Sequence, residues 1–147
     1  MILKSQLPNT AHPALGIDYG AARIGIAATD DFGIMPHPVE TIPVEGGRAI
    51  ERIVQLAAMR KIRTLVVGLP LRLDGSEGSA AASVRKFATA LGTALPGIPL
   101  IFIDESYTTM TATQKLQEAG KKARQQKKII DQAAAMEILN LWMGEPA

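Results

Sequence analysis

The sequence contains no cysteine, only two histidines and no long apolar run. Without cysteine, the chain cannot form a disulfide bond or hold zinc or an iron–sulfur cluster through thiolates. This composition suits a reducing cytoplasm, where we expect the protein to act. No apolar run approaches the roughly 20 residues that a membrane-spanning helix needs, so no membrane partner is expected. The N-terminus also lacks the apolar core of a secretory signal.

Several catalytic motifs are missing as well. The chain has neither a Walker glycine–lysine loop nor a GxGxxG pattern, and no serine or threonine has a recognisable base partner. The histidines, His12 and His37, lie in the N-terminal segment and between two prolines, so we expect both to be incidental. Carboxylates are therefore the strongest candidates for chemistry.

The length of 147 residues, of which 47% are hydrophobic and 20% charged, indicates one globular domain. We expect a flexible tail over residues 1–13 and a single domain over 14–147. Pro36 and Pro38 indicate that the third strand is either an edge strand or an irregular one. The order of elements predicts an α/β fold, in which helices pack against a mixed sheet. Strands are predicted at 15–18, 23–29, 34–42, 64–68 and 100–103, and helices at 47–60, 80–91, 109–119 and 127–143.

Three carboxylates stand in apolar surroundings. Asp18 ends the first predicted strand, Glu105 follows the last one, and Asp131 lies on the apolar face of the C-terminal helix. A buried carboxylate is costly unless a cation meets it, so the three acids together indicate a divalent-metal site. Oxygen ligands without histidine or cysteine favour Mg²⁺ or Mn²⁺ over zinc.

Each acid also has a structural interpretation. Asp18 could cap the turn at Gly20, and Asp131 could be the N-cap of its helix. Adjacent strand residues face opposite sides of a sheet, so only one of Asp104 and Glu105 is expected to enter the site. We favour Glu105 and keep Asp104 as the alternate.

A basic run precedes Asp131. Between positions 115 and 128 the only acid is Glu118, which makes this segment suited to a polyanionic substrate. The plain alternative is a solvated loop. The basic residues are Lys115, Lys121, Lys122, Arg124, Lys127 and Lys128.

Four segments in this order resemble the YqgF/RuvX family, whose members are described as Holliday junction resolvases and pre-16S rRNA nucleases. The similarity covers almost the whole chain beyond residue 13. The four segments are Leu15-Gly16-Ile17-Asp18-Tyr19-Gly20 with Arg23-Ile24-Gly25, Val66-Val67-Gly68-Leu69-Pro70-Leu71 with Asp74-Gly75-Ser76-Glu77, Asp104-Glu105, and Ile130-Asp131-Gln132-Ala133-Ala134-Ala135.

The resemblance implies a ribonuclease H-like fold with a mixed five-stranded sheet flanked by helices. It implies catalytic and metal-binding roles for Asp18, Glu105 and Asp131, and suggests that Arg23 and the loop 69–77 shape the substrate groove. Ser106 stands where the family usually has arginine, and we expect this change to weaken a phosphate or carboxylate contact. Ala21 and Ala22 likewise replace residues that are often more polar.

The expected function is metal-dependent hydrolysis of phosphodiester bonds in structured nucleic acid, with processing of the 5′ end of pre-16S rRNA as the favoured role. Two metal ions roughly 4 Å apart would activate water and stabilise the leaving oxygen. Lys121, Lys122, Arg124, Lys127 and Lys128 would neutralise phosphates without reading sequence.

The alternatives are a resolvase of branched DNA, a ribosome-assembly protein that binds nucleic acid but cleaves weakly, and a nucleotide-binding module. The last resembles the phosphate loop of actin and Hsp70-type ATPases, which need two lobes where this chain supplies one. The sequence leaves open RNA or branched DNA as substrate, and a monomer or a homodimer.

Overall fold

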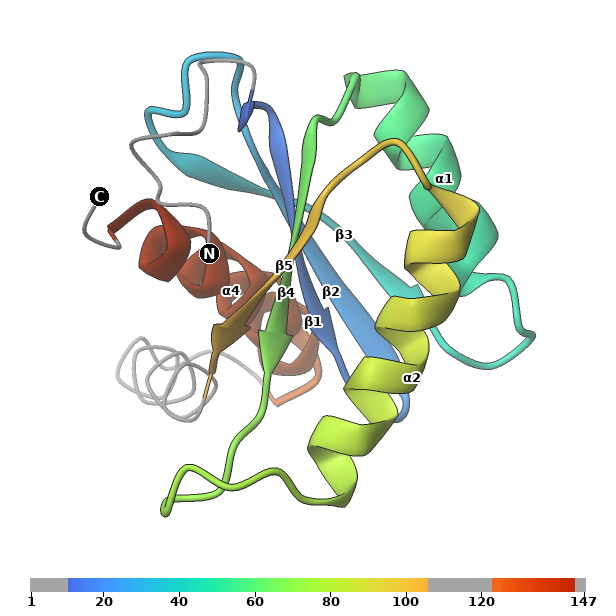
Figure 1. Ribbon diagram of the computed structural model, residues 1–147, viewed down its shortest axis with the longest axis vertical. Helices are drawn as coiled ribbons and strands as arrows, with labels where there is room; N and C mark the ends of the chain where they lie inside the picture. The colour runs from blue at the N-terminus through green and yellow to red at the C-terminus, as the bar shows by residue number, and fades with distance from the viewer. Residues whose placement is uncertain (1–10, 106–122, 145–147) are drawn as a thin grey trace.

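The chain folds into a five-stranded sheet with helices on both faces (Figure 1). The structure is a computed structural model that describes residues 11–105 and 123–144; in the last helix it describes side chains from residue 130 onward. The strand order is β3-β2-β1-β4-β5. β1 runs antiparallel to β2 and parallel to β4, and β4 runs parallel to β5, so the sheet is mixed as predicted. The strands are β1 (Ala14–Tyr19), β2 (Arg23–Thr29), β3 (Pro36–Pro43), β4 (Thr64–Leu69) and β5 (Leu100–Asp104); the helices are α1 (Ala49–Arg60), α2 (Ser79–Ala94) and α4 (Ala123–Gly144).

Most predicted elements are confirmed to within a few residues. The proline-containing third strand does lie at a sheet edge, where a missing N–H costs no ladder hydrogen bond. The last helix begins at Ala123, earlier than the apolar pattern indicated. The helix predicted at 109–119 lies outside the described residues. No helix in the described part of the chain is long and apolar enough to cross a membrane.

The two faces of the sheet build separate hydrophobic cores. Leu15, Ile17 and their neighbours on the other strands pack against α1 and α2. Ala14, Ala27 and Val66 point the other way and pack against α4, the one described helix on the opposite face (Figure 1). Because side chains alternate along a strand, every residue's face is fixed once the cores are known.

The end of the expected flexible tail is packed against the sheet. Ala11 is buried, and its carbonyl accepts a hydrogen bond of 2.7 Å from Thr64 Oγ1. His12 Nδ1 lies 2.8 Å from Thr29 Oγ1, and its ring lies 5.2 Å from that of Trp142. Residues 11–13 thus belong to the folded body, while residues 1–10 lie outside the described part.

Candidate active site

Asp18 lies near the C-terminal end of β1, on the sheet face that α4 covers. Its neighbours Ile17 and Tyr19 point to the α1 and α2 side, where the Tyr19 ring stacks on Phe87 of α2 at 4.5 Å. That contact packs the middle of α2 against the end of β1. The Asp18 carboxylate is thereby directed away from the larger core and toward α4.

Glu105 directly follows β5 and points to the same face. Its backbone N–H donates to the Leu69 carbonyl at 3.2 Å, and only 6% of the residue is exposed. Asp104, one position earlier, is exposed. The structure therefore brings Glu105, and not Asp104, to the site.

Gly68 explains how Asp18 and Glu105 meet although β4 lies between their strands. A Cβ atom at position 68 would lie 2.5 Å from Glu105 Oε2 and 2.7 Å from its Cδ. The Glu105 side chain thus lies over the space that Gly68 leaves and reaches Asp18, with which it shares a hydrogen bond. In the sequence this glycine looked only like the end of a strand.

The two carboxyl groups cannot both ionise cheaply. Burial raises the pKa of Glu105 to about 9, and the charge of Asp18 and their shared hydrogen bond act in the same direction. Burial also raises the pKa of Asp18, partly offset by the hydrogen bond from Glu105, while the charge of Asp131 raises it further. At neutral pH and without a cation, the pair holds one proton, which Glu105 donates to Asp18.

Asp131 lies inside α4, well past the first turn, so the N-cap interpretation is wrong. Its Oδ2 accepts a hydrogen bond of 2.7 Å from Arg23 Nε, in an ion pair whose side chains are 16% and 40% exposed, respectively. Gly25 pairs with Asp18 in the β1–β2 register, and a Cβ there would collide with the Asp131 backbone. The missing side chain lets α4 lie against β2 and brings Asp131 beside Asp18.

Asp18, Glu105 and Asp131 line one cavity of about 510 Å³. Its other walls come from the β1–β2 turn, from Pro70 and from the beginning of α2. The first turn of α2 contains no acid, and no side chain at its N-cap, Gly78, accepts a hydrogen bond from the backbone N–H groups of that turn. The free N–H groups of a helix N-terminus favour an anion, so carboxylates and an anion-attracting helix end face the same space.

The donors fit a hard cation only in part. Half-buried Asp18 and buried Glu105 supply oxygens whose mutual repulsion a divalent ion would relieve. Asp131 is held by Arg23, and among the described residues no group of three His, Cys, Asp or Glu side chains is arranged to hold a metal ion. Asp18 and Glu105 could hold the ion once they give up their shared proton, and Asp131 could join them only by releasing Arg23.

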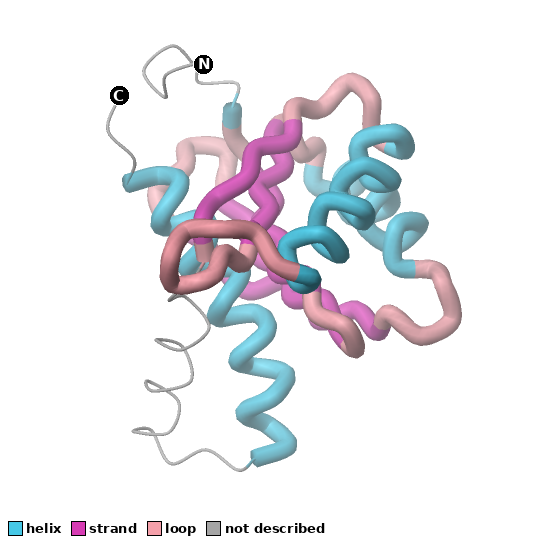
Figure 2. Tube along the Cα trace, turned by 60° about the horizontal axis from the view of Figure 1, so that its bottom comes forward, coloured by secondary structure: helices cyan, strands magenta, loops and turns pink. Residues whose placement is uncertain are grey.

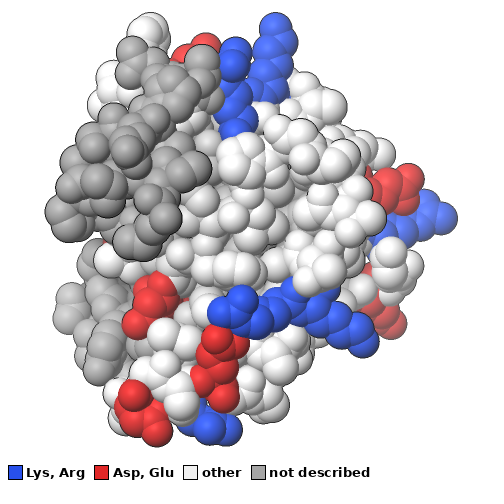
Figure 3. Space-filling view, in the orientation of Figure 1, with Lys and Arg blue, Asp and Glu red and all other residues white. Residues whose placement is uncertain are grey.

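The predicted substrate-binding residues are only partly placed. Arg23 lies at the site, paired with Asp131. Lys121 and Lys122 lie outside the described residues, and Arg124, Lys127 and Lys128 lie at the beginning of α4, where only the backbone is described. In the view of Figure 3, the described residues place acidic and basic side chains around the lower end and the rim of the molecule. The centre of this view is largely uncharged.

The loop between β4 and α2 is tied to its own helix. Leu71 and Glu77 form an isolated bridge, and Glu77 accepts two hydrogen bonds from Arg85, at 2.6 and 2.8 Å. Within the segment 69–77, only Pro70 lines the cavity.

Comparison with solved structures identifies the fold. RuvC of Thermus thermophilus in complex with a Holliday junction substrate has a TM-score of 0.53 with this chain, covering 89% of it and 95% of RuvC at 13% identity. Another structure of RuvC from the same organism has a TM-score of 0.50 with this chain. The fold is therefore ribonuclease H-like.

Sequence comparison identifies the family. A relative from Rhodococcus erythropolis named "Putative pre-16S rRNA nuclease" is 43% identical over 136 residues, which cover 89% of this chain and 77% of the relative. A relative of the same name from Streptomyces coelicolor is 44% identical over 129 residues, covering 85% and 75%. The family model described as "RuvX: Holliday junction resolvase" matches residues 12–145. This chain is therefore a member of the RuvX family.

Proposed function

We propose that the protein is a metal-dependent nuclease that hydrolyses phosphodiester bonds in structured RNA, with the 5′ end of pre-16S rRNA as its substrate in the cytoplasm. The observation that carries this proposal is the hydrogen-bonded pair of half-buried Asp18 and buried Glu105 in a cavity that Asp131 also lines. The names of the relatives supply the substrate.

Asp18 and Glu105, joined by Asp131, would hold Mg²⁺ or Mn²⁺. When bound, such an ion supplies Lewis acidity toward a phosphoryl oxygen and lowers the pKa of a bound water. The role of Glu105 is then to give up the proton that it shares with Asp18, so that both carboxylates face the cavity as anions. Burial keeps water from screening their charge.

The first turn of α2 would bind the phosphate next to the scissile bond. Its backbone N–H groups and the positive end of its dipole attract an anion without reading the base sequence. Ala80 of this turn lines the same cavity as Asp18, and stacking of Tyr19 on Phe87 packs the middle of α2 against the end of β1.

The basic run would hold the flanking phosphates. Figure 2 shows the N-terminal part of α4 projecting beyond the sheet, and Arg124, Lys127 and Lys128 lie on this part. A projecting basic helix can contact nucleic acid that extends past the cavity, and its contribution to affinity falls with added salt.

Branched DNA is the second candidate substrate, because the family model is described as a Holliday junction resolvase. The test is a direct comparison: purified protein is given a pre-16S rRNA 5′ segment or a four-way DNA junction, with Mg²⁺, Mn²⁺ or a chelator. We expect the RNA to be cut only with metal, and Glu105→Gln to abolish the cut. Preferred cleavage of the junction would replace RNA by branched DNA, and undiminished cleavage in chelator would refute the metal-dependent reaction.

A further inference from the structure

Arg23 is placed where a positive charge affects the carboxylate site. It is the first residue of β2 and shares the α4-facing side of that strand with Gly25 and Ala27. Of the ion pairs formed between described residues, only that of Arg23 and Asp131 includes a carboxylate of the cavity. The guanidinium therefore neutralises the one site acid that does not share the Asp18–Glu105 proton.

The backbone of Asp131 has little freedom, because it packs against Gly25 without an intervening side chain. Its carboxylate can change partner only by rotation of the side chain. One orientation meets Arg23 at 2.7 Å, and another would turn toward Asp18, whose ionisation already responds to the charge of Asp131. A carboxylate oxygen bound to a guanidinium is a poor ligand for a second cation, since the two positive charges repel.

We propose that Arg23 takes the place of a cation at Asp131 in the metal-free protein, and must release Asp131 before that carboxylate can join Asp18 and Glu105 around a divalent ion. This inference rests on the metal site of the proposed function. Arg23 is then a positioning residue: it acts through Asp131, and it opposes metal binding while it keeps the metal-free site neutral enough to fold.

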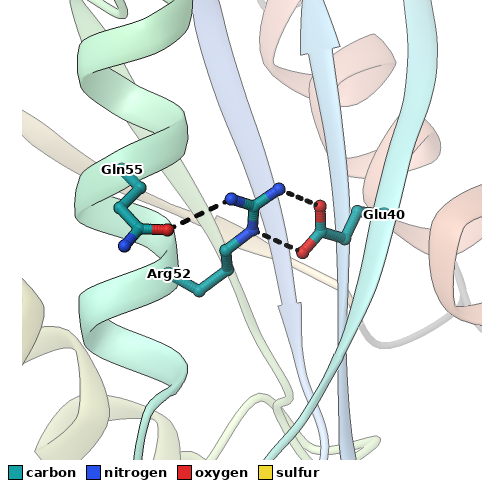
Figure 4. Close-up of polar contacts among 3 residues, drawn as sticks. All are labelled: Glu40, Arg52 and Gln55. Atoms are coloured by element: carbon teal, nitrogen blue, oxygen red, sulfur yellow. Dashed lines mark hydrogen bonds and ion pairs between the residues drawn. The ribbon is translucent and has the colours of Figure 1, made fainter.

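The chain offers a matched control. Arg52 donates two hydrogen bonds to Glu40, of 2.7 and 2.8 Å, and its side chain is 37% exposed, close to the 40% of Arg23 (Figure 4). Neither residue lines the carboxylate cavity. Arg52→Gln therefore removes the same charge and a comparable ion pair without touching Asp131.

The experiment is calorimetric titration of Mn²⁺ alone into metal-free wild type, Arg23→Gln, Arg23→Lys and Arg52→Gln. An ion pair of this kind couples by about 0.2–1 kcal/mol, so its removal should lower the Kd of Arg23→Gln for Mn²⁺ by up to about fivefold. Arg23→Lys, which keeps the charge, and Arg52→Gln should bind Mn²⁺ as wild type does. Unchanged or weaker binding by Arg23→Gln would overturn the inference.

A second measurement needs no variant. In wild type the Arg23 Nε–H resonance should shift and exchange faster with water when Mg²⁺ is added, because its hydrogen bond to Asp131 is broken. A resonance that stays the same at saturating Mg²⁺ would overturn the inference even if Arg23→Gln failed to fold. Absence of any Mn²⁺ or Mg²⁺ binding by wild type would refute the metal site itself, and with it both proposals.

Discussion

At the scale of single residues, each carboxylate of the cavity is compensated within the described part of the chain by a proton or by a cation. Asp18 and Glu105 share a proton, and Asp131 forms an ion pair with Arg23. Sequence analysis identified the three acids because a carboxylate next to apolar residues is costly. It did not pair Arg23 with Asp131, since 108 positions separate them and only the packing of α4 on β2 brings them together.

The raised pKa of Glu105 makes the stability of the metal-free protein depend on pH. The folded protein holds this proton up to about pH 9, whereas the unfolded chain releases it near its ordinary pKa of 4.5. Its contribution to stability is therefore complete below about pH 4.5 and is lost as the pH rises toward 9.

Glu105→Gln cannot ionise but can still donate a hydrogen bond to Asp18. We therefore expect the free energy of unfolding in chelator to fall less between pH 5 and pH 9 for this variant than for wild type. Urea unfolding at pH 5, 7 and 9 measures the difference. Parallel pH profiles would mean that Glu105 ionises in the folded protein much as it does in the unfolded chain.

At the scale of elements, close contact between α4 and the sheet builds the site. Gly25 lets the helix backbone reach β2 at Asp131, and Gly68 leaves the space over which Glu105 reaches Asp18. Periodicity predicted the strands and helices, because each follows from local patterns of apolar residues. Periodicity could not predict the close contacts at Gly25 and Gly68, because they depend on residues distant in the chain. It also did not predict the earlier start of α4 at Ala123.

Gly25→Ala tests this packing of α4 on β2. The new Cβ would collide with the Asp131 backbone, so α4 must move away from β2. We expect a loss of at least about 1–3 kcal/mol in the free energy of unfolding, together with weaker Mn²⁺ binding. Denaturant unfolding and calorimetry measure the two effects.

Gly92→Ala is the matched control, because a Cβ at this position of α2 meets no atom within 4 Å. Alanine replaces glycine there in the last turn of the helix and should raise stability by up to about 0.5–1 kcal/mol. Equal effects of the two substitutions would show that the close approach at Gly25 does not determine the packing of α4.

At the scale of the whole molecule, the described part of the chain is a ribonuclease H-like core whose parallel strands β1 and β5 bring their carboxylates to one end of the sheet. The sequence predicted this architecture well, since β-β-β-α-β-α-β order and the family resemblance agree. The packing of Ala11 and His12 was missed because their partners, Thr64 and Thr29, lie on separate strands.

Nucleic-acid binding is tested by replacing Lys121, Lys122, Lys127 and Lys128 with alanine. If these lysines neutralise phosphates, the log–log slope of affinity against salt should flatten by about 0.7–0.9 for each phosphate that the variant leaves unneutralised. Lys86→Ala, on the other side of the sheet from α4, serves as the control and should leave the slope unchanged. A quadruple variant with the wild-type slope would identify the run as a solvated segment without a role in binding.

The central claim, that the Asp18–Glu105 pair is the metal-binding centre of a nuclease, is tested most directly by the cleavage rate of Asp18→Asn. Asn keeps the size of the side chain and removes the charge that a metal requires. We expect a folded variant, at least as thermally stable as wild type in chelator because repulsion from Asp131 is gone. Its Mg²⁺-dependent cleavage of the pre-16S rRNA segment should fall about a hundredfold or more, since metal catalysis supplies several kcal/mol. Cleavage at the wild-type rate by purified Asp18→Asn, with contaminating nuclease excluded, would contradict the account.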